Sequence, residues 1–205
     1  ADASYREKAK YLAQEAKFNT DIIDLLYIDS DGNFYSEDGK RFSGVGKSYF
    51  TEPKSGRRYM SEPYLSVIDN NFILTLSVPI KDDANNFAGV LCADLPSMWL
   101  SDQIDDIVVG NTGYCYILGP EGNTVAHKNE ELVTKAANAI TMAKTDASLK
   151  ELATFQEQAL EIDTSEVGYY TYKGVYNISS YATIKTTDWT CIIVAPYDEF
   201  MGTIK

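Results

Sequence analysis

The sequence predicts an α+β fold in which a long N-terminal helix precedes two tandem modules, each an antiparallel sheet with flanking helices. Three observations predict it. A helical stripe of apolar residues opens the 205-residue chain, strand-like runs bounded by turn residues follow, and the second half repeats local sequence of the first. We therefore expect a helix over residues 1–26, a first module over 27–108 and a second module over 109–205.

The N-terminal segment carries apolar or small residues at helical spacing, with charged residues on the other face. The stripe consists of Tyr5, Ala9, Leu12, Ala16, Ile23 and Leu26. No capping signal is visible before Ala1–Asn19, so we expect the sequence to begin within a helix, as an excised fragment would. The stripe is expected to pack on its own module or, alternatively, to form a dimer seam.

Strand-like runs alternate with turn clusters such as Asp29–Asn33 along the rest of the chain. In the first half the runs are 24–28, 72–80 and 87–95. In the second half they are 113–118, 169–175, 178–184 and 189–195. Residues 130–162 between them are rich in Ala, Leu, Glu and Lys, a composition typical of helix.

Two sequence echoes in the same order support a tandem of related modules. The first pairs 27–33 with 116–123, and the second pairs 78–81 and 87–94 with 182–185 and 189–196. We expect the boundary between the modules near Asp102–Thr112.

Composition excludes several classes of protein. Acidic residues outnumber basic ones by 30 to 18, and the resulting formal charge of −12 repels nucleic-acid phosphates and anionic lipids. No apolar run approaches the roughly 20 residues that cross a bilayer. The three cysteines each lie within an apolar run, which indicates small buried thiols rather than a disulfide framework or a metal site.

Two motif fragments do not complete their patterns. Gly46-Lys47-Ser48 ends like a phosphate-binding loop, but Arg41 stands where the first glycine is needed. The run from Asp29 to Asn33 begins like a calcium loop, but Phe34 and Lys40 replace its glycine and glutamate. We interpret the second fragment as a hairpin turn.

His127 is the only histidine, so a histidine-based metal site is excluded and a general base would have to be this residue or a perturbed carboxylate. No Gly-x-Ser-x-Gly nucleophile motif occurs. We expect His127 to be a half-exposed polar residue, and we expect no catalytic residue, metal or cofactor in this chain.

Aromatic and polar residues are dense between Lys47 and Asp94, a mixture that suits a binding pocket. Asp94 follows the apolar run Gly89–Ala93, where a buried carboxylate would cost several kcal/mol, roughly, without a cationic or donor partner. The alternative is that Asp94 caps a helix that starts near Pro96.

The sequence resembles the double Cache (dCache) family of extracytoplasmic sensor domains, which consist of two PAS-like modules. The resemblance covers nearly the whole chain. It rests on the segments 48–50, 56–64, 76–80 and 89–95 in the first module and 112–117, 122–127 and 187–189 in the second.

The resemblance implies a ligand site in the first, membrane-distal module. Amino-acid-binding members carry an Arg-x-Trp-Tyr element, which reads Lys47-Ser48-Tyr49-Phe50 here, followed by a tyrosine and an aspartate that help hold the ligand's ammonium group. Tyr64 and Asp94 match that pair, whereas Ser66 replaces a further aspartate. Lysine lacks the bidentate fork of arginine, so an amine or amino-acid-like ligand is expected. The candidate ligand-binding residues are Lys47, Tyr49, Phe50, Tyr59, Tyr64, Ser66, Ser77 and Asp94.

The resemblance also implies where the domain is located, how it is anchored and how it assembles. Such domains belong to chemoreceptors, sensor histidine kinases and diguanylate cyclases, so we expect an extracytoplasmic domain anchored in the cell membrane by flanking transmembrane helices, with a homodimer formed through the N-terminal helix. Three alternatives remain: a secreted solute-binding or protein-contact module, a hydrolase that uses His127, and a spacer without a small-molecule ligand.

Overall fold

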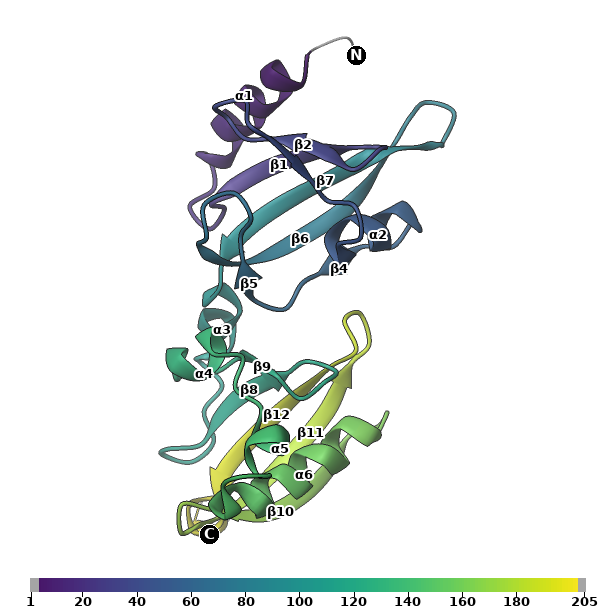
Figure 1. The fold of residues 1–205 in the computed structure, drawn as a ribbon. Coiled ribbons are helices and arrows are strands. Elements are labelled where there is room, and N and C mark those ends of the chain that lie inside the picture. The colour runs from purple at the N-terminus through teal and green to yellow at the C-terminus, as the bar shows by residue number, and fades with distance from the viewer. Residues whose placement is uncertain (1–3, 203–205) are drawn as a thin grey trace. The chain divides into compact units, whose positions relative to one another are not determined.

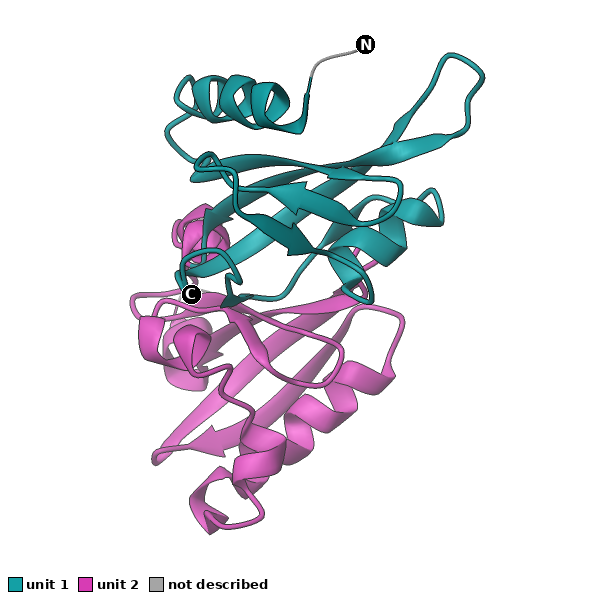
Figure 2. Cartoon of the chain, turned by 45° about the horizontal axis from the view of Figure 1, so that its top comes forward, with its two compact units in different colours: residues 1–97 teal, residues 98–205 magenta. Residues whose placement is uncertain are grey.

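The computed structural model describes residues 4–202, and the chain divides into two compact units, residues 1–97 and 98–205 (Figures 1 and 2). Each unit contains a five-stranded antiparallel sheet, so the predicted α+β class with antiparallel sheets is confirmed. No helix in residues 4–202 is both long and apolar enough to cross a membrane.

The first unit is built on a sheet with the strand order β1-β7-β6-β4, and β5 also pairs with β6. These strands are β1 (Asp24–Asp29), β4 (Tyr59–Met60), β5 (Tyr64–Leu65), β6 (Phe72–Lys81) and β7 (Phe87–Pro96). A separate two-stranded ribbon consists of β2 (Asn33–Tyr35) and β3 (Arg41–Ser43), and the helices are α1 (Tyr5–Ala16) and α2 (Ser48–Lys54).

The predicted long helix is wrong in both its start and its length. Helix α1 begins after Ser4, whose hydroxyl accepts from the Glu7 N–H while the Glu7 carboxylate accepts from the Ser4 N–H, and this capping box was visible in the sequence. The helix ends at Ala16 rather than at residue 26. Leu26 has helical spacing from Ile23, yet it lies in β1, because pairing with β7 decides the conformation there.

The stripe of α1 packs on its own unit. The Tyr5 ring stacks on Tyr27 with ring centroids 6.4 Å apart, and its hydroxyl donates to Asp29 Oδ2 at 2.8 Å. Ala16 at the end of the helix is buried. Asp29 Oδ1 also accepts from the N–H groups of Asp31 and Asn33, so the fragment that began like a calcium loop is a tight turn. It is not the predicted hairpin turn, because β1 and β2 on its two sides belong to different sheets.

The two faces of the first sheet meet different partners, because successive side chains of a strand point to opposite sides. On one face, the buried residues of β1 and β7 pack against α2 and form the core of the unit. This core consists of Leu26, Ile28, Phe34, Tyr49, Phe50, Val90 and Cys92. Helix α1 contacts β1 through the ring of Tyr27, which belongs to the opposite set of side chains.

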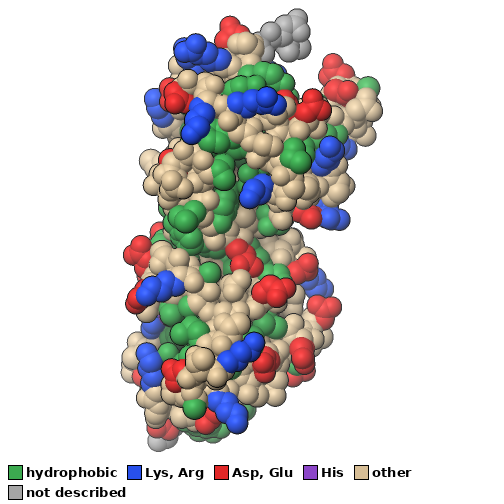
Figure 3. All heavy atoms as spheres, in the orientation of Figure 1, with side chains coloured by type: hydrophobic (Ala, Val, Ile, Leu, Met, Phe, Trp, Pro, Cys, Tyr) green, Lys and Arg blue, Asp and Glu red, His purple; other side chains and the backbone are tan. Residues whose placement is uncertain are grey.

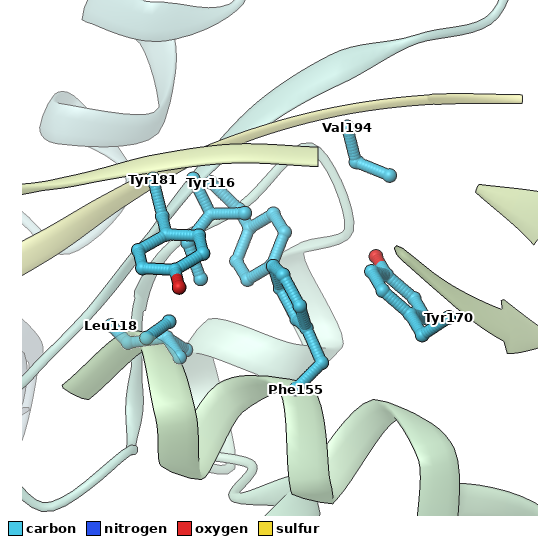
Figure 4. Packing of buried hydrophobic residues seen from close by; sticks show 8 residues of the cluster. Tyr116, Leu118, Phe155, Tyr170, Tyr181 and Val194 are labelled. Carbon is cyan, nitrogen blue, oxygen red and sulfur yellow. The ribbon is translucent and has the colours of Figure 1, made fainter. Parts of the chain in front are cut away.

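The second unit has the strand order β10-β11-β12-β8-β9. Its elements are α3 (Trp99–Ile104), β8 (Tyr114–Leu118), β9 (Thr124–Ala126), α4 (Glu130–Thr134), α5 (Ala139–Met142), a short 3-10 turn (Ala147–Leu149), α6 (Lys150–Glu161), β10 (Glu166–Tyr172), β11 (Val175–Ile184), β12 (Trp189–Pro196) and α7 (Tyr197–Gly202). Phe155 of α6 reaches into the core, with its ring centroid 4.6 Å from Tyr170 and 5.5 Å from Tyr181 (Figure 4).

The helical composition of residues 130–162 gives several short helices rather than one. The side chains of Asn129, Asn138 and Asp146 each accept from a backbone N–H at the start of a new element. Ala136 between the first two caps has a positive φ of 45°. Asparagine and aspartate caps therefore divide a segment whose other residues favour helix.

The two units share a strand order but divide earlier than the predicted boundary at 108/109. In each sheet the first strand pairs with the last, and the last pairs with the strand before it. Helix α3 belongs to the second unit, since the Ser101 hydroxyl accepts from the His127 N–H at 3.1 Å. The division therefore falls between Ser97 and Met98.

The three cysteines are free thiols. Cys92 and Cys115 are buried, and Cys191 is half-buried on the neighbouring strand to Cys115, with the two sulfur atoms 3.5 Å apart.

Candidate ligand-binding site in the first unit

Three neighbouring strands bring polar side chains together on one face of the first sheet. Thr75 of β6 and Asp24 of β1 lie directly opposite Asp94 of β7, and Ser77 lies opposite Cys92 two positions along. Residues directly opposite in an antiparallel pair have side chains on the same face. A row of two carboxylates and a hydroxyl therefore crosses the sheet beside an otherwise apolar core.

A chain of hydrogen bonds ends at Asp94. The Thr75 hydroxyl donates to Asp94 Oδ1 at 2.6 Å, and the hydroxyl groups of Tyr64 and Thr75 are 2.8 Å apart. A threonine hydroxyl has one proton, so Tyr64 must donate to Thr75 while Thr75 donates to Asp94. The Asp94 atom Oδ1 is thereby occupied, and Oδ2 is left for another donor.

Asp94 is a buried carboxylate without a cationic partner. Its exposed fraction is 4 %, and within the described part of the chain no Lys or Arg forms an ion pair with it. Burial raises the pKa of Asp94 to about 6. The Thr75 hydrogen bond lowers it by less than burial raises it, and the charges of Asp24 and Asp69 add smaller increases. Burial likewise raises the pKa of Asp24. The Asp94 carboxylate therefore lacks a positively charged group that would stabilise its ionised form.

The alternative role of Asp94 as a helix cap is wrong. Asp94 lies inside β7, and α3 begins at Trp99 after Met98, which makes no side-chain capping bond. The predicted strand-like run 87–95 already contained Asp94, and the structure extends it by one residue to Pro96, so no helix starts close enough for Asp94 to cap it.

Two hollows adjoin the aromatic pair formed by Tyr49 and Tyr64. Their rings stack with centroids 6.0 Å apart and planes 21° apart. The outer cleft, of about 290 Å³, is open to solvent, whereas the inner hollow at Asp94 has only about 10 Å³, roughly the space of one water at most by the same measure. Both tyrosines line both hollows, whereas Asp94 lines only the inner one, so the two hollows adjoin at this pair.

The remaining predicted residues fall into three groups. Lys47 and Tyr59 line the outer cleft, and the side chain of Lys47 is exposed. Ser66 lines the inner hollow, but its hydroxyl already accepts from the Ile68 N–H. Phe50 lines neither hollow and packs in the core against Phe87.

Ser77 is a special case among the predicted residues. It lies next to Tyr59 in the sheet, and its buried hydroxyl has no hydrogen-bond partner. An unpartnered buried hydroxyl costs about 1–3 kcal/mol, which a ligand that reached it would offset.

Sequence reasoning missed two residues of the site, Thr75 and Ser61. The Ser61 hydroxyl accepts from the Thr75 N–H at 2.8 Å and fixes the strand next to Asp94. Thr75 was detectable, because it lies two residues before Ser77 in an apolar strand and so shares its face. Ser61 belongs to a connection between two-residue strands, which has no periodicity to read.

His127 lies in the second unit and is buried rather than half-exposed. Its Nδ1 accepts from the Asn129 N–H at 2.8 Å, and no Ser or Thr hydroxyl of residues 4–202 bonds to its ring. On the face of the molecule shown in Figure 3, acidic and basic side chains are interspersed.

Comparison with known proteins gives a family match over almost the whole chain. The family model described as "Cache domain" (dCache_1) matches residues 1–204. The chain is 23 % identical over 194 residues to the methyl-accepting chemotaxis protein TlpA of Bacillus subtilis, which is 92 % of this chain and 26 % of TlpA. It is 29 % identical over 79 residues to the methyl-accepting chemotaxis protein PscA of Pseudomonas syringae, which is 38 % of this chain and 12 % of PscA. The chain thus spans about a quarter or less of these relatives.

Solved structures share the fold at low sequence identity. The ligand-binding domain of the Pseudomonas fluorescens chemoreceptor CtaA in complex with L-leucine has a TM-score of 0.67 at 17 % identity, covering 94 % of this chain and 78 % of that one. The ligand-binding domain of Mlp24 with asparagine has a TM-score of 0.61 at 16 % identity, covering 97 % and 78 %. The extracellular domain of the putative histidine kinase mmHK1S-Z2 has a TM-score of 0.68 at 16 % identity, covering 97 % and 84 %.

Proposed function

This chain belongs to the dCache family of Cache domains, and from that membership we propose that it is the extracytoplasmic sensor domain of a membrane-bound receptor. In this proposal it binds a small molecule with an ammonium group in the first unit, which is the membrane-distal one. Its relatives are chemotaxis receptors several times its length, and in this proposal the membrane anchors and the signalling output are assigned to parts of the receptor outside this domain. The domain itself catalyses no reaction.

The observation that carries the proposal is the buried, unpaired carboxylate of Asp94. A ligand ammonium group has three hydrogen-bond donors and a positive charge. Oδ2 of Asp94 lacks a donor, and Asp94 with its acidic neighbours lacks a positive charge to balance it. Tyr49 and Tyr64 line the hollow at Asp94, and once their stacked rings part, their faces add cation–π attraction. Amide or hydroxyl ligands would leave the charge of Asp94 uncompensated.

Lys47 at the outer cleft determines how strongly the site would bind the carboxylate of an amino acid. Its exposed ammonium is a mobile point charge that can attract a ligand carboxylate but cannot hold it in bidentate fashion. The solved relatives CtaA and Mlp24 bind amino acids, L-leucine and asparagine. We therefore assign this site to amines and amino-acid-like molecules, with the ammonium group contributing more affinity than the carboxylate.

Ligand entry requires a change in the first unit. The inner hollow is too small for any ligand, so the Tyr49–Tyr64 pair must part before an ammonium group reaches Asp94. Tyr49 lies on α2 and Tyr64 on β5, and each would move relative to the central strands β6 and β7. A ligand that binds only the parted arrangement shifts the population toward it, and that shift is the signal.

The receptor is proposed to act as a homodimer through its N-terminal helix. Tyr11 and Phe18 on this segment keep exposed fractions of 59 % and 86 %, although the opposite side of α1 packs on β1. Sedimentation of the domain joined to its membrane-flanking segments should show a dimer that Phe18→Ser weakens. Equal sedimentation of both proteins would remove this part of the proposal.

A titration with three matched compounds tests the function. A thermal-shift screen of amino acids and simple amines first gives the best amino acid, because a bound ligand raises the melting temperature by mass action. Isothermal titration then compares that amino acid with the amine that lacks its carboxylate and the acid that lacks its ammonium group. We expect the amine to retain measurable binding and the acid to lose it. Binding of the acid without binding of the amine would reject the ammonium assignment.

Ligand affinity should fall in acid, because protonated Asp94 carries no charge to attract an ammonium group. With the pKa of Asp94 at about 6, the ionised fraction decreases about tenfold between pH 7.5 and pH 5. We therefore expect the dissociation constant of an amine ligand to rise about tenfold over that interval, and titrations at constant ionic strength measure it. An affinity that stays constant over this range would exclude Asp94 as the partner of the ammonium group.

A further inference from the structure

The second unit contains a hollow that the sensor proposal does not use. It has about 90 Å³ of space for the centres of water molecules and lies between the sheet and helices α4 to α6. One water needs roughly 10–15 Å³ by this measure, so the space fits a molecule of about six heavy atoms. The sheet contributes the rings of Tyr114, Tyr116, Tyr170 and Tyr172, and the helices contribute mainly apolar side chains.

Gln156 on α6 gives this hollow an unmet hydrogen-bonding group. Its exposed fraction is 5 %, its Nε2 donates to the Tyr116 hydroxyl at 3.4 Å, and its Oε1 has no partner. A tyrosine hydroxyl both donates and accepts, so turning the amide over would satisfy Oε1 and leave Nε2 unpaired instead. In either orientation, one polar atom of the Gln156 amide therefore has no hydrogen-bond partner.

His127 adds an uncharged donor to the same hollow. Because Nδ1 accepts from the Asn129 N–H, the proton of the neutral ring lies on Nε2. Burial and the neighbouring Lys128 lower the pKa of His127 to about 4, so the ring carries no charge at neutral pH. The ring also packs against Tyr114, with centroids 5.1 Å apart.

The hollow offers no charge to a ligand. No Asp, Glu, Lys or Arg is among the residues that line it, and the nearby ammonium of Lys128 lies against the Tyr114 ring, 3.9 Å from its centroid. A bound carboxylate or ammonium group would lose its hydration without gaining an opposite charge. This chemistry is the reverse of that at Asp94 in the first unit.

We infer that this hollow is a second ligand site, which binds a small uncharged molecule with an apolar body and a primary amide at one end. An amide both donates and accepts, so it complements Gln156 in either orientation and accepts from Nε2–H of His127. The apolar body lies among the tyrosine rings and Met142, which is partly exposed at the edge of the hollow. The domain would then respond to two ligands of different chemistry.

A titration of the ¹⁵N-labelled domain with isobutyramide, isobutyrate and isobutylamine tests the inference. These probes share a branched apolar body and differ in the charge of the polar end. We expect isobutyramide to shift amide signals from residues 114–172 in a saturable manner, with at least tenfold weaker binding of the two charged probes. Gln156→Leu, which keeps the size of the side chain, should weaken isobutyramide binding at least tenfold.

A second variant and a control make the result decisive. Ala139→Leu on α5 places a larger side chain in the hollow and should abolish isobutyramide binding even if Gln156→Leu does not fold. Asp94→Asn should leave isobutyramide binding unchanged, which separates this site from the one in the first unit. The inference is overturned if isobutyramide causes no saturable shifts, if the shifts lie outside residues 114–172, if the charged probes bind equally, or if both variants in the second unit bind as the wild type does.

Discussion

Replacing Asp94 with asparagine should make the ligand-free domain more stable and should abolish binding of its ammonium ligand. The pKa of Asp94 rises from 3.8 to about 6 on folding. A carboxyl group whose pKa is raised on folding contributes stability that is present below its unfolded pKa and is lost as the pH rises through the folded value. At pH 7.5 the charged Asp94 thus destabilises the empty domain.

The size of this effect follows from the shift in pKa. About two pKa units correspond to roughly 2–3 kcal/mol, which asparagine would recover while it keeps the hydrogen bond with the Thr75 hydroxyl. A gain of 1 kcal/mol raises the melting temperature by about 2–4 °C for a protein of this size, so an increase of about 4 °C or more is expected at pH 7.5. Near pH 4 the wild type and the variant should melt at similar temperatures, because Asp94 is then protonated.

Asp83→Asn is the matched control, because Asp83 lies exposed in the turn between β6 and β7 and the substitution makes the same change in net charge. It should alter neither the melting temperature nor ligand affinity. For Asp94→Asn we expect at least a hundredfold loss of affinity, the cost of about 3 kcal/mol for a removed buried charge partner. A variant that is less stable than the wild type, or that binds the ligand unchanged, would contradict this role for Asp94.

Gly89→Ala should be the most destabilising single substitution considered for the first unit. Gly89 has a φ of +148° within β7, between its partners Asp29 and Ile80. A Cβ at this position would lie 2.4 Å from the carbonyl oxygen of Ile28, which is backbone of the neighbouring strand and cannot rotate away. The strain and the displaced strand pairing together should cost about 3–5 kcal/mol of the free energy of unfolding.

Urea denaturation followed by circular dichroism measures this loss, and Gly56→Ala provides the comparison. Gly56 also has a positive φ, of 90°, but no heavy atom lies within 4 Å of the position a Cβ would take. Its substitution should therefore cost only about 1–2 kcal/mol for the left-handed conformation. Equal losses in the two variants would show that the approach to Ile28 is not what requires glycine at position 89.

The parts of the fold that the sequence revealed are those with a long, regular pattern. Strands β6, β7, β11 and β12 are each eight to ten residues of apolar and β-branched composition, and their predicted limits lie within a few residues of the observed ones. Strands β4 and β5 have two residues each, too few for any periodicity to be visible. The end of α1 was misjudged because Ile23 and Leu26 continue its spacing, although the Ile23 N–H donates to the Asp94 carbonyl and Leu26 pairs with Cys92 of β7.

The residues of the candidate site could likewise be predicted only in part from the sequence. Asp94 could be identified because a carboxylate at the end of an apolar run is unusual, and the aromatic residues Tyr49 and Tyr64 follow from the family resemblance. The role of Thr75 as the donor to Asp94 depends on which residues of β6 and β7 face one another. That register is set by the whole sheet. The hollow at Gln156 likewise combines residues from α6 and three strands that no local pattern connects.

A crystal structure of the domain with its best amine or amino acid ligand tests the central claim most directly. We expect the ligand nitrogen within hydrogen-bonding distance of Asp94 Oδ2, about 2.7–2.9 Å, with the rings of Tyr49 and Tyr64 moved apart to admit it. A ligand bound with its nitrogen away from Asp94, or bound outside the first unit while the Tyr49–Tyr64 pair stays stacked, would contradict it.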